Sequence, residues 1–285
     1  MNLIGIVQGR LSPPLPDRLQ GFPWQTWEQE FEDARRLGFD AIEWVFDAER
    51  AQDNPLRHAA GRARIRQRST QTGLRVYSVC ADYFLTHPFF RVTPAEQAKS
   101  VQVLLELIGE ARAVGSTTVL LPVLEDAEIR SAQDRTELIA GLQEPLALVR
   151  SLEMQLGIET ELPVIEYLAL IEQIGHPFAK AYYDVGNAAA KGYAVDADVR
   201  RLSAHLGGVH IKDRLLGGPS VPLGQGAVDF PRFFEALGEI GYAGPIVLQT
   251  AFGTRYREDA ATHLEFVRRH LGRRAEGAEI GVPVR

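Results

Sequence analysis

Short apolar segments alternate with longer segments of helical hydrophobic period along this chain of 285 residues. Such alternation is typical of repeated units in which a buried strand is followed by a helix. Eight segments predict strands, at residues 3–7, 41–46, 75–80, 117–123, 158–162, 179–185, 207–213 and 245–250. Eight repeats without a clear linker predict an α/β fold with a single (β/α)8 barrel, because open doubly wound sheets usually have fewer strands.

The segments between these strands carry recognisable helix signals. One helix is predicted from Thr93, an N-cap with Glu96 three positions on, to Gly115. The other predicted helices lie at about 24–38, 136–157, 196–206 and 258–271, with one more that ends near residue 73. The barrel should therefore occupy residues 1–272, followed by a polar, loosely held tail at 273–285.

Composition and charge argue against several classes of protein. The formal net charge of −6 disfavours a nucleic-acid binder, which would normally carry a basic stripe. No basic leader opens the chain, and no segment reaches the roughly 18 uninterrupted apolar residues of a membrane span. The single cysteine, Cys80, lies in an apolar run, which predicts an inert core thiol, no internal disulfide and a cytoplasmic setting.

Four predicted strands in the second half of the chain end in a group that can bind a divalent metal. These groups are Glu159, Asp184, His210 and Gln249. A closed parallel barrel brings the C-terminal ends of its strands together, so we expect the four groups to meet. Two carboxylates, an imidazole and an amide oxygen suit Mn²⁺ best, with Mg²⁺, Co²⁺ or Zn²⁺ as alternatives. The simpler alternative for each residue is a satisfied buried polar group inside the barrel.

Several longer motifs, in their order and spacing, resemble one known family. They are GIVQGRLSP, GFDAIEW, LGIETELP, YYDVGNA, GGVHIKDR, PLGQGAVDF and GPIVLQTA, and they cover nearly the whole barrel. The chain resembles the xylose isomerase-like TIM barrels, the sugar isomerase/epimerase superfamily that also contains endonuclease IV. The resemblance implies metal ligands at Glu159, Asp184, His210 and the residue of strand eight. Sugar epimerases of the family carry a glutamate at that last position, whereas this chain has Gln249.

The resemblance implies a metal-dependent isomerase or epimerase of a sugar or sugar phosphate, with Glu159 as ligand and base. A metal that chelates a carbonyl and its neighbouring hydroxyl acidifies the C–H bond between them, and a carboxylate then removes the proton to form an enediolate. The carboxamide of Gln249 cannot exchange protons near neutral pH. An aldose–ketose isomerase needs only one base. An epimerase needs a second proton carrier, for which the candidates are Glu43, Asp82, Glu125 and Lys212.

Further polar residues near the strand ends are predicted to bind substrate: Glu43, Asp82, Glu161, Asn187 and Arg214. Glu161 lies two residues after Glu159 and should therefore point to the same face of the strand. Asn187 occupies a place where several relatives carry a histidine near substrate. An arginine matching Arg214 contacts substrate in related epimerases, and the alternative here is an ion pair with Asp213 at the barrel rim.

Lys212 should face the same way as His210 within the predicted strand at 207–213. We expect it to take part in catalysis or to contact an anionic oxygen or phosphate. A Schiff-base lysine is an alternative without support from its surroundings. His87 fits either a substrate contact or a plain loop position.

Two loop regions have open roles. Four aromatic residues lie in predicted loops: Trp24, Phe84, Phe89 and Phe90. They could form an apolar lid, and the alternative is that they pack into the barrel rim or into a homo-oligomer contact. The glycine-rich segment 217–226 predicts a mobile cover, with a phosphate cradle as the alternative.

The leading interpretation is thus a sugar isomerase or epimerase with a small-molecule sugar or sugar phosphate as partner. A dehydratase of an inosose-like keto-polyol is a second enzyme interpretation, because the same enolate can expel a β-hydroxyl. A nuclease of the endonuclease IV type is disfavoured, since that class assembles three zinc ions with several histidines. A non-catalytic barrel that binds a sugar or a protein partner is the alternative that Gln249 supports.

Overall fold

The computed structural model describes residues 2–16 and 18–279, with side chains through residue 272. Its main sheet is a closed barrel in the strand order β1-β10-β7-β6-β5-β4-β3-β2, and every pairing in it is parallel. The eight strands are β1 Ile4–Val7, β2 Ala41–Val45, β3 Arg75–Cys80, β4 Thr118–Val123, β5 Gln155–Thr160, β6 Ala179–Asp184, β7 Leu206–Ile211 and β10 Ile246–Leu248. The predicted (β/α)8 barrel is confirmed.

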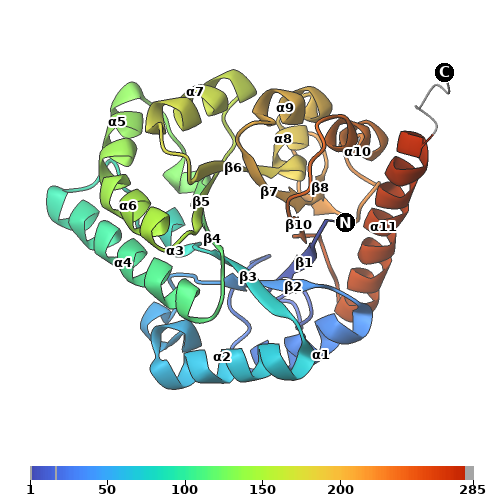
Figure 1. The fold of residues 1–285 in the computed structure, drawn as a ribbon, viewed down its shortest axis with the longest axis horizontal. Coiled ribbons are helices and arrows are strands. Elements are labelled where there is room, and N and C mark those ends of the chain that lie inside the picture. The colour runs from blue at the N-terminus through green and yellow to red at the C-terminus, as the bar shows by residue number, and fades with distance from the viewer. Residues whose placement is uncertain (1, 17, 280–285) are drawn as a thin grey trace.

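Helices surround the barrel as an outer ring (Figure 1). The longer ones are α1 Trp27–Leu37, α2 Ala59–Thr72, α4 Pro94–Ala113, α5 Ala132–Gly141, α6 Gln143–Ser151, α7 Val164–Ile174, α9 Val195–Leu202, α10 Phe230–Glu239 and α11 Tyr256–Glu279. Shorter turns are α3 Tyr83–Thr86, α8 Val185–Ala190, η1 Ala51–Asp53, η2 Pro55–Arg57 and η3 Glu125–Ala127. None of the described helices is both long enough and apolar enough to span a bilayer.

The start of α4 shows how local sequence sets a helix boundary. Thr93 Oγ1 accepts a hydrogen bond from the Glu96 N–H, and the Glu96 carboxylate accepts one from the Thr93 N–H. Pro94 follows at the first helical position, where its missing N–H costs nothing. The predicted capping box is confirmed.

The predicted helix at 136–157 is wrong in its extent. Two helices, α5 and α6, meet at Leu142 instead, because Pro145 has no N–H to donate to the carbonyl of Gly141. The chain then turns at Glu153, which has a φ of 54°, and β5 begins at Gln155 rather than at residue 158. The polar Gln155 and the small Gly157 interrupt the apolar pattern, so the sequence pattern does not predict the first half of this strand.

The region after β7 also differs from its prediction. β7 ends at Ile211, and Asp213–Arg214 (β8) pairs with Ser220–Val221 (β9) as a two-stranded antiparallel hairpin outside the barrel. The buried Asp213 carboxylate accepts hydrogen bonds from the backbone N–H groups of Gly224, Gly226 and Val228. The glycine-rich segment is therefore tied to the end of β7.

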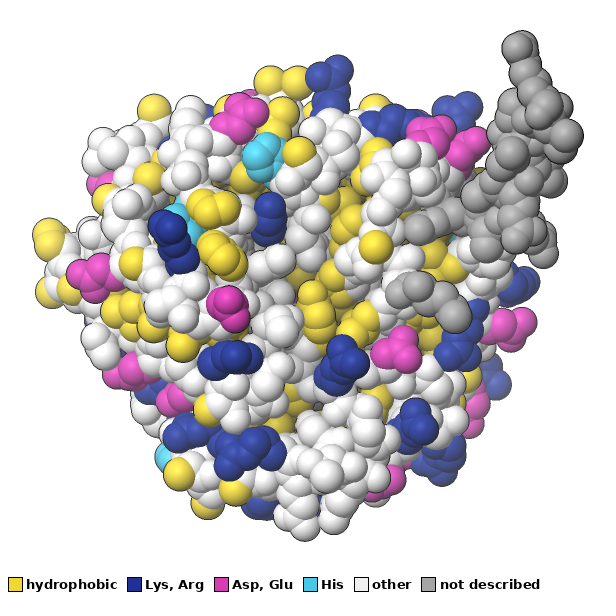
Figure 2. Space-filling model, viewed as in Figure 1, with side chains coloured by type: hydrophobic (Ala, Val, Ile, Leu, Met, Phe, Trp, Pro, Cys, Tyr) yellow, Lys and Arg dark blue, Asp and Glu magenta, His cyan; other side chains and the backbone are white. Residues whose placement is uncertain are grey.

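The last helix is longer than predicted. It begins at Tyr256 and continues to Glu279, across the predicted boundary between barrel and tail at residue 272. Residues 280–285 of the predicted tail lie outside the described residues. On the face shown in Figure 2, basic and acidic side chains are scattered among uncharged ones.

The Tyr182 side chain of β6 packs in a cluster with Cys80 and Leu120, and its hydroxyl reaches Glu43 on β2. A Cβ atom at Gly208 on β7 would lie 2.2 Å from Tyr182 Cε2, and one at Gly157 on β5 would lie 2.9 Å from Tyr182 Cδ2. The two glycines thus leave the space that the Tyr182 ring occupies. The Tyr182 ring also packs edge-on against His210 at a centroid distance of 4.8 Å. One of the predicted metal ligands is therefore packed against the Tyr182 ring.

Candidate metal centre

Three of the four predicted ligands converge at the C-terminal mouth of the barrel. Glu159 comes from β5, Asp184 ends β6 and His210 lies on β7. Each offers one ligand atom, these atoms all lie within 4.8 Å of one another, and all three residues are buried. The parallel register explains the convergence, because Asp184 is paired with His210 across neighbouring strands.

Two atoms of this group are suited to receive a metal ion. Asp184 Oδ2 and His210 Nδ1 are buried, and neither has a hydrogen-bond partner among the described residues. The other oxygen of Asp184 accepts the N–H of Asn187 at 2.8 Å, which leaves Oδ2 directed into the site. A buried polar atom without a partner is costly, and metal coordination would remove that cost. Carboxylate and imidazole donors fit a divalent cation.

Behind His210 lies Glu43 of β2, which is fully buried. His210 Nε2 donates to Glu43 Oε1 at 2.6 Å. The hydroxyls of Ser78 and Tyr182 donate to Glu43 Oε2 at 2.6 and 2.9 Å. Although the sequence predicted Glu43 to bind substrate, both of its oxygens are engaged by protein donors. The arrangement orients the imidazole so that Nδ1 faces Glu159, whose Oε1 lies 3.7 Å away.

Burial and charge shift the proton affinities of this group. Burial alone would lower the pKa of His210, but the carboxylates of Glu43 and Glu159 raise it to about 10. Burial works against the charged form of Glu43, but the imidazole and the hydroxyl donors hold the pKa of Glu43 below its usual range. Burial raises the pKa of Glu159, with His210 opposing the shift. Glu159 is thus a more basic carboxylate than an exposed one.

Gln249 follows β10 directly, and its backbone N–H donates to the Ile211 carbonyl at 3.0 Å. Lys212 Nζ donates to Gln249 Oε1 at 3.3 Å and lies 3.7 Å from Asp184 Oδ2. Lys212 lies beyond the end of β7 rather than within it, which corrects its predicted place in a strand ending at residue 213. Its side chain still reaches the metal-binding group. One ammonium therefore lies between the amide and the carboxylate.

The other predicted substrate-binding residues form a polar group at the rim. Arg214 Nη1 donates to Asn187 Oδ1 at 3.0 Å and lies 3.6 Å from Glu161 Oε1. Lys191 Nζ lies 3.0 Å from Glu161 Oε2. Arg214 thus contacts Asn187 and Glu161, while Asp213 binds the glycine-rich loop.

Asp82 lies on the opposite side of the mouth, just after β3. It accepts hydrogen bonds from Gln20 Nε2 at 2.6 Å and from the Cys80 thiol at 3.2 Å. Burial raises the pKa of Asp82 to about 6. Cys80 is buried as predicted, and burial followed by the nearby Asp82 charge raises the pKa of its thiol well above the usual range.

The remaining loop candidates are divided between packing and exposure. Phe84, Phe89 and Phe90 are buried in the main hydrophobic core, which agrees with rim packing rather than with a lid. His87 stacks on the Tyr83 ring at a centroid distance of 4.1 Å. Glu125, a candidate second base, is exposed at the start of η3.

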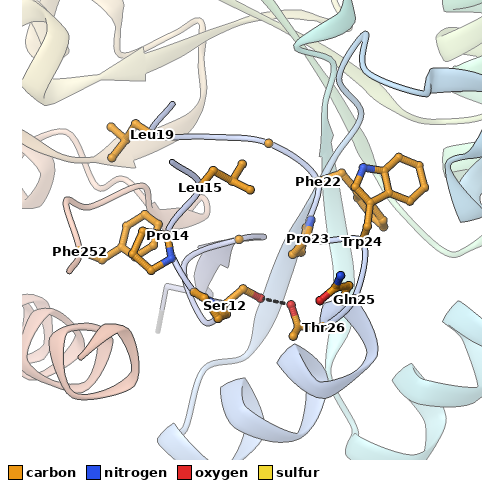
Figure 3. Close-up of a pocket in the computed structure, with 13 residues that line it drawn as sticks. Ser12, Pro14, Leu15, Leu19, Phe22, Pro23, Trp24, Gln25, Thr26 and Phe252 are labelled. Atoms are coloured by element: carbon orange, nitrogen blue, oxygen red, sulfur yellow. Dashed lines mark hydrogen bonds between the residues drawn. The ribbon is translucent and has the colours of Figure 1, made fainter. Parts of the chain in front are cut away.

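The loop between β1 and α1 borders a cavity of about 320 Å³ (Figure 3). Apolar side chains line much of it, namely Pro14, Leu15, Leu19, Phe22, Pro23, Trp24 and Phe252. The hydroxyls of Ser12 and Thr26 are hydrogen-bonded at 2.7 Å at one side. Among the described residues that line this cavity, none belongs to the metal-binding group. It is therefore a neighbouring feature and not the metal centre itself.

The sequence did not predict several residues that contact this site, among them Tyr182 and Gln20. Tyr182 lies two positions before Asp184 on β6, so strand alternation could have placed both on the inner face. Gln20 lies in the proline-rich loop after β1, and its amide contacts Arg10, Asp82 and Gln249. No sequence pattern marks a residue of this kind, because its partners come from distant parts of the chain.

Sequence comparisons find sugar epimerases among the proteins similar to this chain. L-ribulose-5-phosphate 3-epimerase UlaE of Salmonella paratyphi A is 28% identical over 234 residues, which cover 79% of this chain and 82% of that protein. The protein of the same name from Shigella flexneri serotype 5b is 26% identical over 234 residues, which again cover 79% of this chain and 82% of that protein.

Solved structures share the fold. A structure of L-ribulose 3-epimerase superposes with a TM-score of 0.80 at 19% identity, covering 100% of both chains. D-Allulose 3-epimerase from Methylomonas sp. in complex with D-allulose gives 0.75 at 19% identity, covering 94% of this chain and 97% of that one. The family model of the xylose isomerase-like TIM barrel matches residues 31–270. The chain therefore belongs to the xylose isomerase-like TIM barrel family.

Proposed function

We propose that this protein is a divalent-metal-dependent epimerase of a keto sugar or keto sugar phosphate, acting at the carbon next to the carbonyl. The observation that carries the proposal is the convergence of Glu159, Asp184 and His210, in which two buried ligand atoms have no hydrogen-bond partner within the described part of the chain. The names of the relatives support the substrate class, since they describe 3-epimerases of ribulose 5-phosphate, ribulose and allulose.

A divalent metal held by Glu159, Asp184, His210 and the Gln249 oxygen would polarise the substrate carbonyl and acidify the neighbouring C–H bond. We assign the removal of that proton to Glu159, because the family resemblance gives this glutamate both a ligand role and a proton-transfer role. The C–H electron pair then forms the C=C bond of an enediolate. Epimerisation requires that a proton return from the other face of this intermediate.

Lys212 is our candidate for the second proton carrier. The family resemblance implies a glutamate at the position of Gln249, and an amide cannot deliver a proton in its place. The Lys212 ammonium lies 3.3 Å from the Gln249 oxygen, so it is a proton donor beside the position where that glutamate would lie. The ammonium would give one proton to the enediolate and recover it from solvent. The simpler one-base isomerase needs no such group.

The rim residues complete the proposal. We assign Arg214, Asn187 and Glu161 to substrate hydroxyl or phosphate oxygens, because they form one connected polar group beside the metal-binding residues. Asp82 faces the mouth from β3 and is assigned to a substrate hydroxyl. Glu43 is assigned to the orientation of His210 instead of to substrate.

Hydrogen exchange with solvent tests the two proton carriers separately. In D₂O with Mn²⁺ and a panel of ribulose, allulose and their phosphates, the parent protein should exchange the C3 hydrogen and form the 3-epimer. Glu159→Gln should lose both reactions by at least about 10²-fold, the lower end of a general base's contribution. Lys212→Met should keep the exchange and lose the epimer. Glu172→Gln, an exposed glutamate on α7, is the matched control.

The same assay separates the competing functions. Full exchange in Glu159→Gln would remove this residue as the base, and epimer formation in Lys212→Met would remove Lys212. Loss of water from a keto-polyol, detected as a new double bond, would identify a dehydratase. A parent protein that binds sugars but exchanges no hydrogen across the panel would be a non-catalytic barrel. Repeating the assay with Mg²⁺, Co²⁺ and Zn²⁺ identifies the metal that supports the reaction.

A further inference from the structure

The Gln20 side chain links three parts of the mouth that are far apart in the sequence. Its Oε1 accepts hydrogen bonds from Arg10 Nη2 at 3.0 Å and from Gln249 Nε2 at 2.8 Å. Its Nε2 donates to Asp82 Oδ2 at 2.6 Å and approaches Cys80 Sγ at 3.8 Å. The amide oxygen and the amide nitrogen of Gln20 are therefore each engaged twice, which is their usual capacity.

The chemistry of the neighbours allows only one orientation of the Gln20 amide. Arg10 has only donors, so it must meet the amide oxygen, whereas the Asp82 carboxylate has only acceptors and must meet the amide nitrogen. A rotated amide would place N–H groups against the guanidinium and an oxygen against the carboxylate. Both contacts would be repulsive.

The Arg10 guanidinium is itself held in place. Arg10 is 1% exposed, its Nη1 donates to the Leu19 carbonyl at 3.0 Å, and its Cζ lies 5.1 Å from the centre of the Phe252 ring. Because the Leu19 carbonyl belongs to the residue before Gln20, one guanidinium holds both the loop backbone and the side chain. The position of Gln20 relative to Arg10 is thus fixed through both its side chain and the adjacent backbone.

The orientation of the Gln20 amide determines the orientation of the Gln249 amide. Since Gln20 presents an oxygen, Gln249 must present its Nε2, and its own Oε1 is turned to the other side. On that side lies the Lys212 ammonium, which also approaches Asp184 Oδ2. A glutamate at position 249 would instead place a carboxylate oxygen against the Gln20 oxygen. The neutral side chain at this position is therefore matched to Gln20.

We propose that Gln20 is a positioning residue that holds the Gln249 amide with its oxygen directed toward the metal centre. The inference rests on the proposed function, because it takes Gln249 as a metal ligand. It assigns the loop between β1 and α1 a part in metal binding, although none of the proposed metal ligands lies on that loop. It also gives a physical reason for the amide at position 249.

A double-mutant cycle on Mn²⁺ affinity tests this role without relying on turnover. Gln20→Met should raise the dissociation constant for Mn²⁺ about tenfold, the lower end of the effect for residues that support a metal ligand. In a Gln249→Met background the same change should have no further effect, because Gln20 acts through Gln249. Gln25→Met, an exposed glutamine in the same loop, is the matched control and should leave the affinity unchanged.

A reversed pair provides the rescue. In the double variant Gln20→Glu with Asp82→Asn, the new amide at position 82 donates to the new carboxylate at position 20. That carboxylate still accepts from Arg10 and Gln249, so affinity should return to near the parent value. Two results would overturn the positioning role. One is a tenfold loss of Mn²⁺ affinity on Gln20→Met that also occurs in the Gln249→Met background, and the other is a reversed pair whose Mn²⁺ affinity stays low. Unchanged affinity in Gln20→Met alone would overturn it as well. Unchanged affinity in Gln249→Met would instead refute the proposed ligand set, and this inference with it.

Discussion

At the scale of single residues, the metal centre depends on partners that hold each ligand in one orientation. His210 has two ring nitrogens, and the hydrogen bond from Nε2 to Glu43 leaves Nδ1 for the site. Ser78 and Tyr182 hold Glu43 in turn. Strand-end positions in the sequence predicted Glu159, Asp184 and His210 as a group, but not this second set of contacts. Those contacts join strands β2, β3, β6 and β7 across the barrel.

Replacement of Glu43 should weaken the metal site without touching a ligand. Glu43→Gln removes the negative charge beside His210 and turns an amide nitrogen toward the Ser78 and Tyr182 hydroxyls. We expect a roughly 10- to 100-fold increase in the Mn²⁺ dissociation constant, which is the range for residues that support a metal-bound histidine. Mn²⁺ titration followed by electron paramagnetic resonance measures it. Glu32→Gln, at an exposed position of α1, should bind as the parent does, and equal affinity in Glu43→Gln would contradict the assignment.

At the scale of elements, α1 and the loop after β1 are joined by one buried carboxyl group. Glu30 of α1 accepts the N–H of Gly9 at 2.9 Å, the N–H of Leu11 at 3.2 Å and the hydroxyl of Ser12 at 2.7 Å. Burial, only partly offset by these hydrogen bonds, raises the pKa of Glu30 from 4.5 to about 7. The loop that carries Gln20 is thus anchored to a helix by a titratable group.

This anchor predicts a pH-dependent stability. The pKa of Glu30 is higher in the folded protein than in the unfolded chain. Its contribution to the free energy of unfolding is therefore complete below pH 4.5 and is lost as the pH rises through 7. The contribution of Glu30 to the free energy of unfolding should therefore fall by about 3 kcal/mol across this window. Urea unfolding at several pH values should show a flatter profile for Glu30→Gln, whereas Glu32→Gln should retain the parent profile. Parallel profiles for the parent and Glu30→Gln would contradict the prediction.

Element boundaries show where sequence patterns fail. The capping box at Thr93 and Glu96 marks the start of α4 correctly, since every group in it is local. The break between α5 and α6 and the early start of β5 were missed. β5 begins at Gln155 because this residue pairs with Thr118, a partner on another strand that no local pattern can reveal.

At the scale of the whole molecule, closure of the barrel depends on complementary volumes on neighbouring strands, since Gly208 of β7 is paired with Tyr182 of β6. Gly208→Ala should be destabilising by about 1–3 kcal/mol, because the new Cβ would overlap the Tyr182 ring. The melting temperature should fall by roughly 2–4 °C for each kcal/mol. Gly109→Ala, in α4, should instead be neutral or stabilising, because outside its own helix backbone no atom of the described residues lies within 4 Å of the new Cβ.

A second substitution separates ring overlap from other causes. Gly208→Ala should cost less stability in a Tyr182→Leu background than in the parent, because the smaller side chain vacates the space near residue 208. If Gly208→Ala melts with the parent, the Tyr182 ring is free to move and does not set the interior packing. Calorimetry of the single and double variants decides between these outcomes.

The amino-acid sequence by itself determined the eight-unit repeat, the closed parallel barrel and three converging metal-binding groups. These follow from local periodicity and from the rule that parallel strands end on one side of a barrel. Only the tertiary structure decided that Glu43 lies behind His210, that Lys212 reaches Asp184, and that Gln20 contacts Gln249. Contacts such as that between Gln20 and Gln249, 229 residues apart, depend on how loops and strands meet in space, and this information is absent from any short segment.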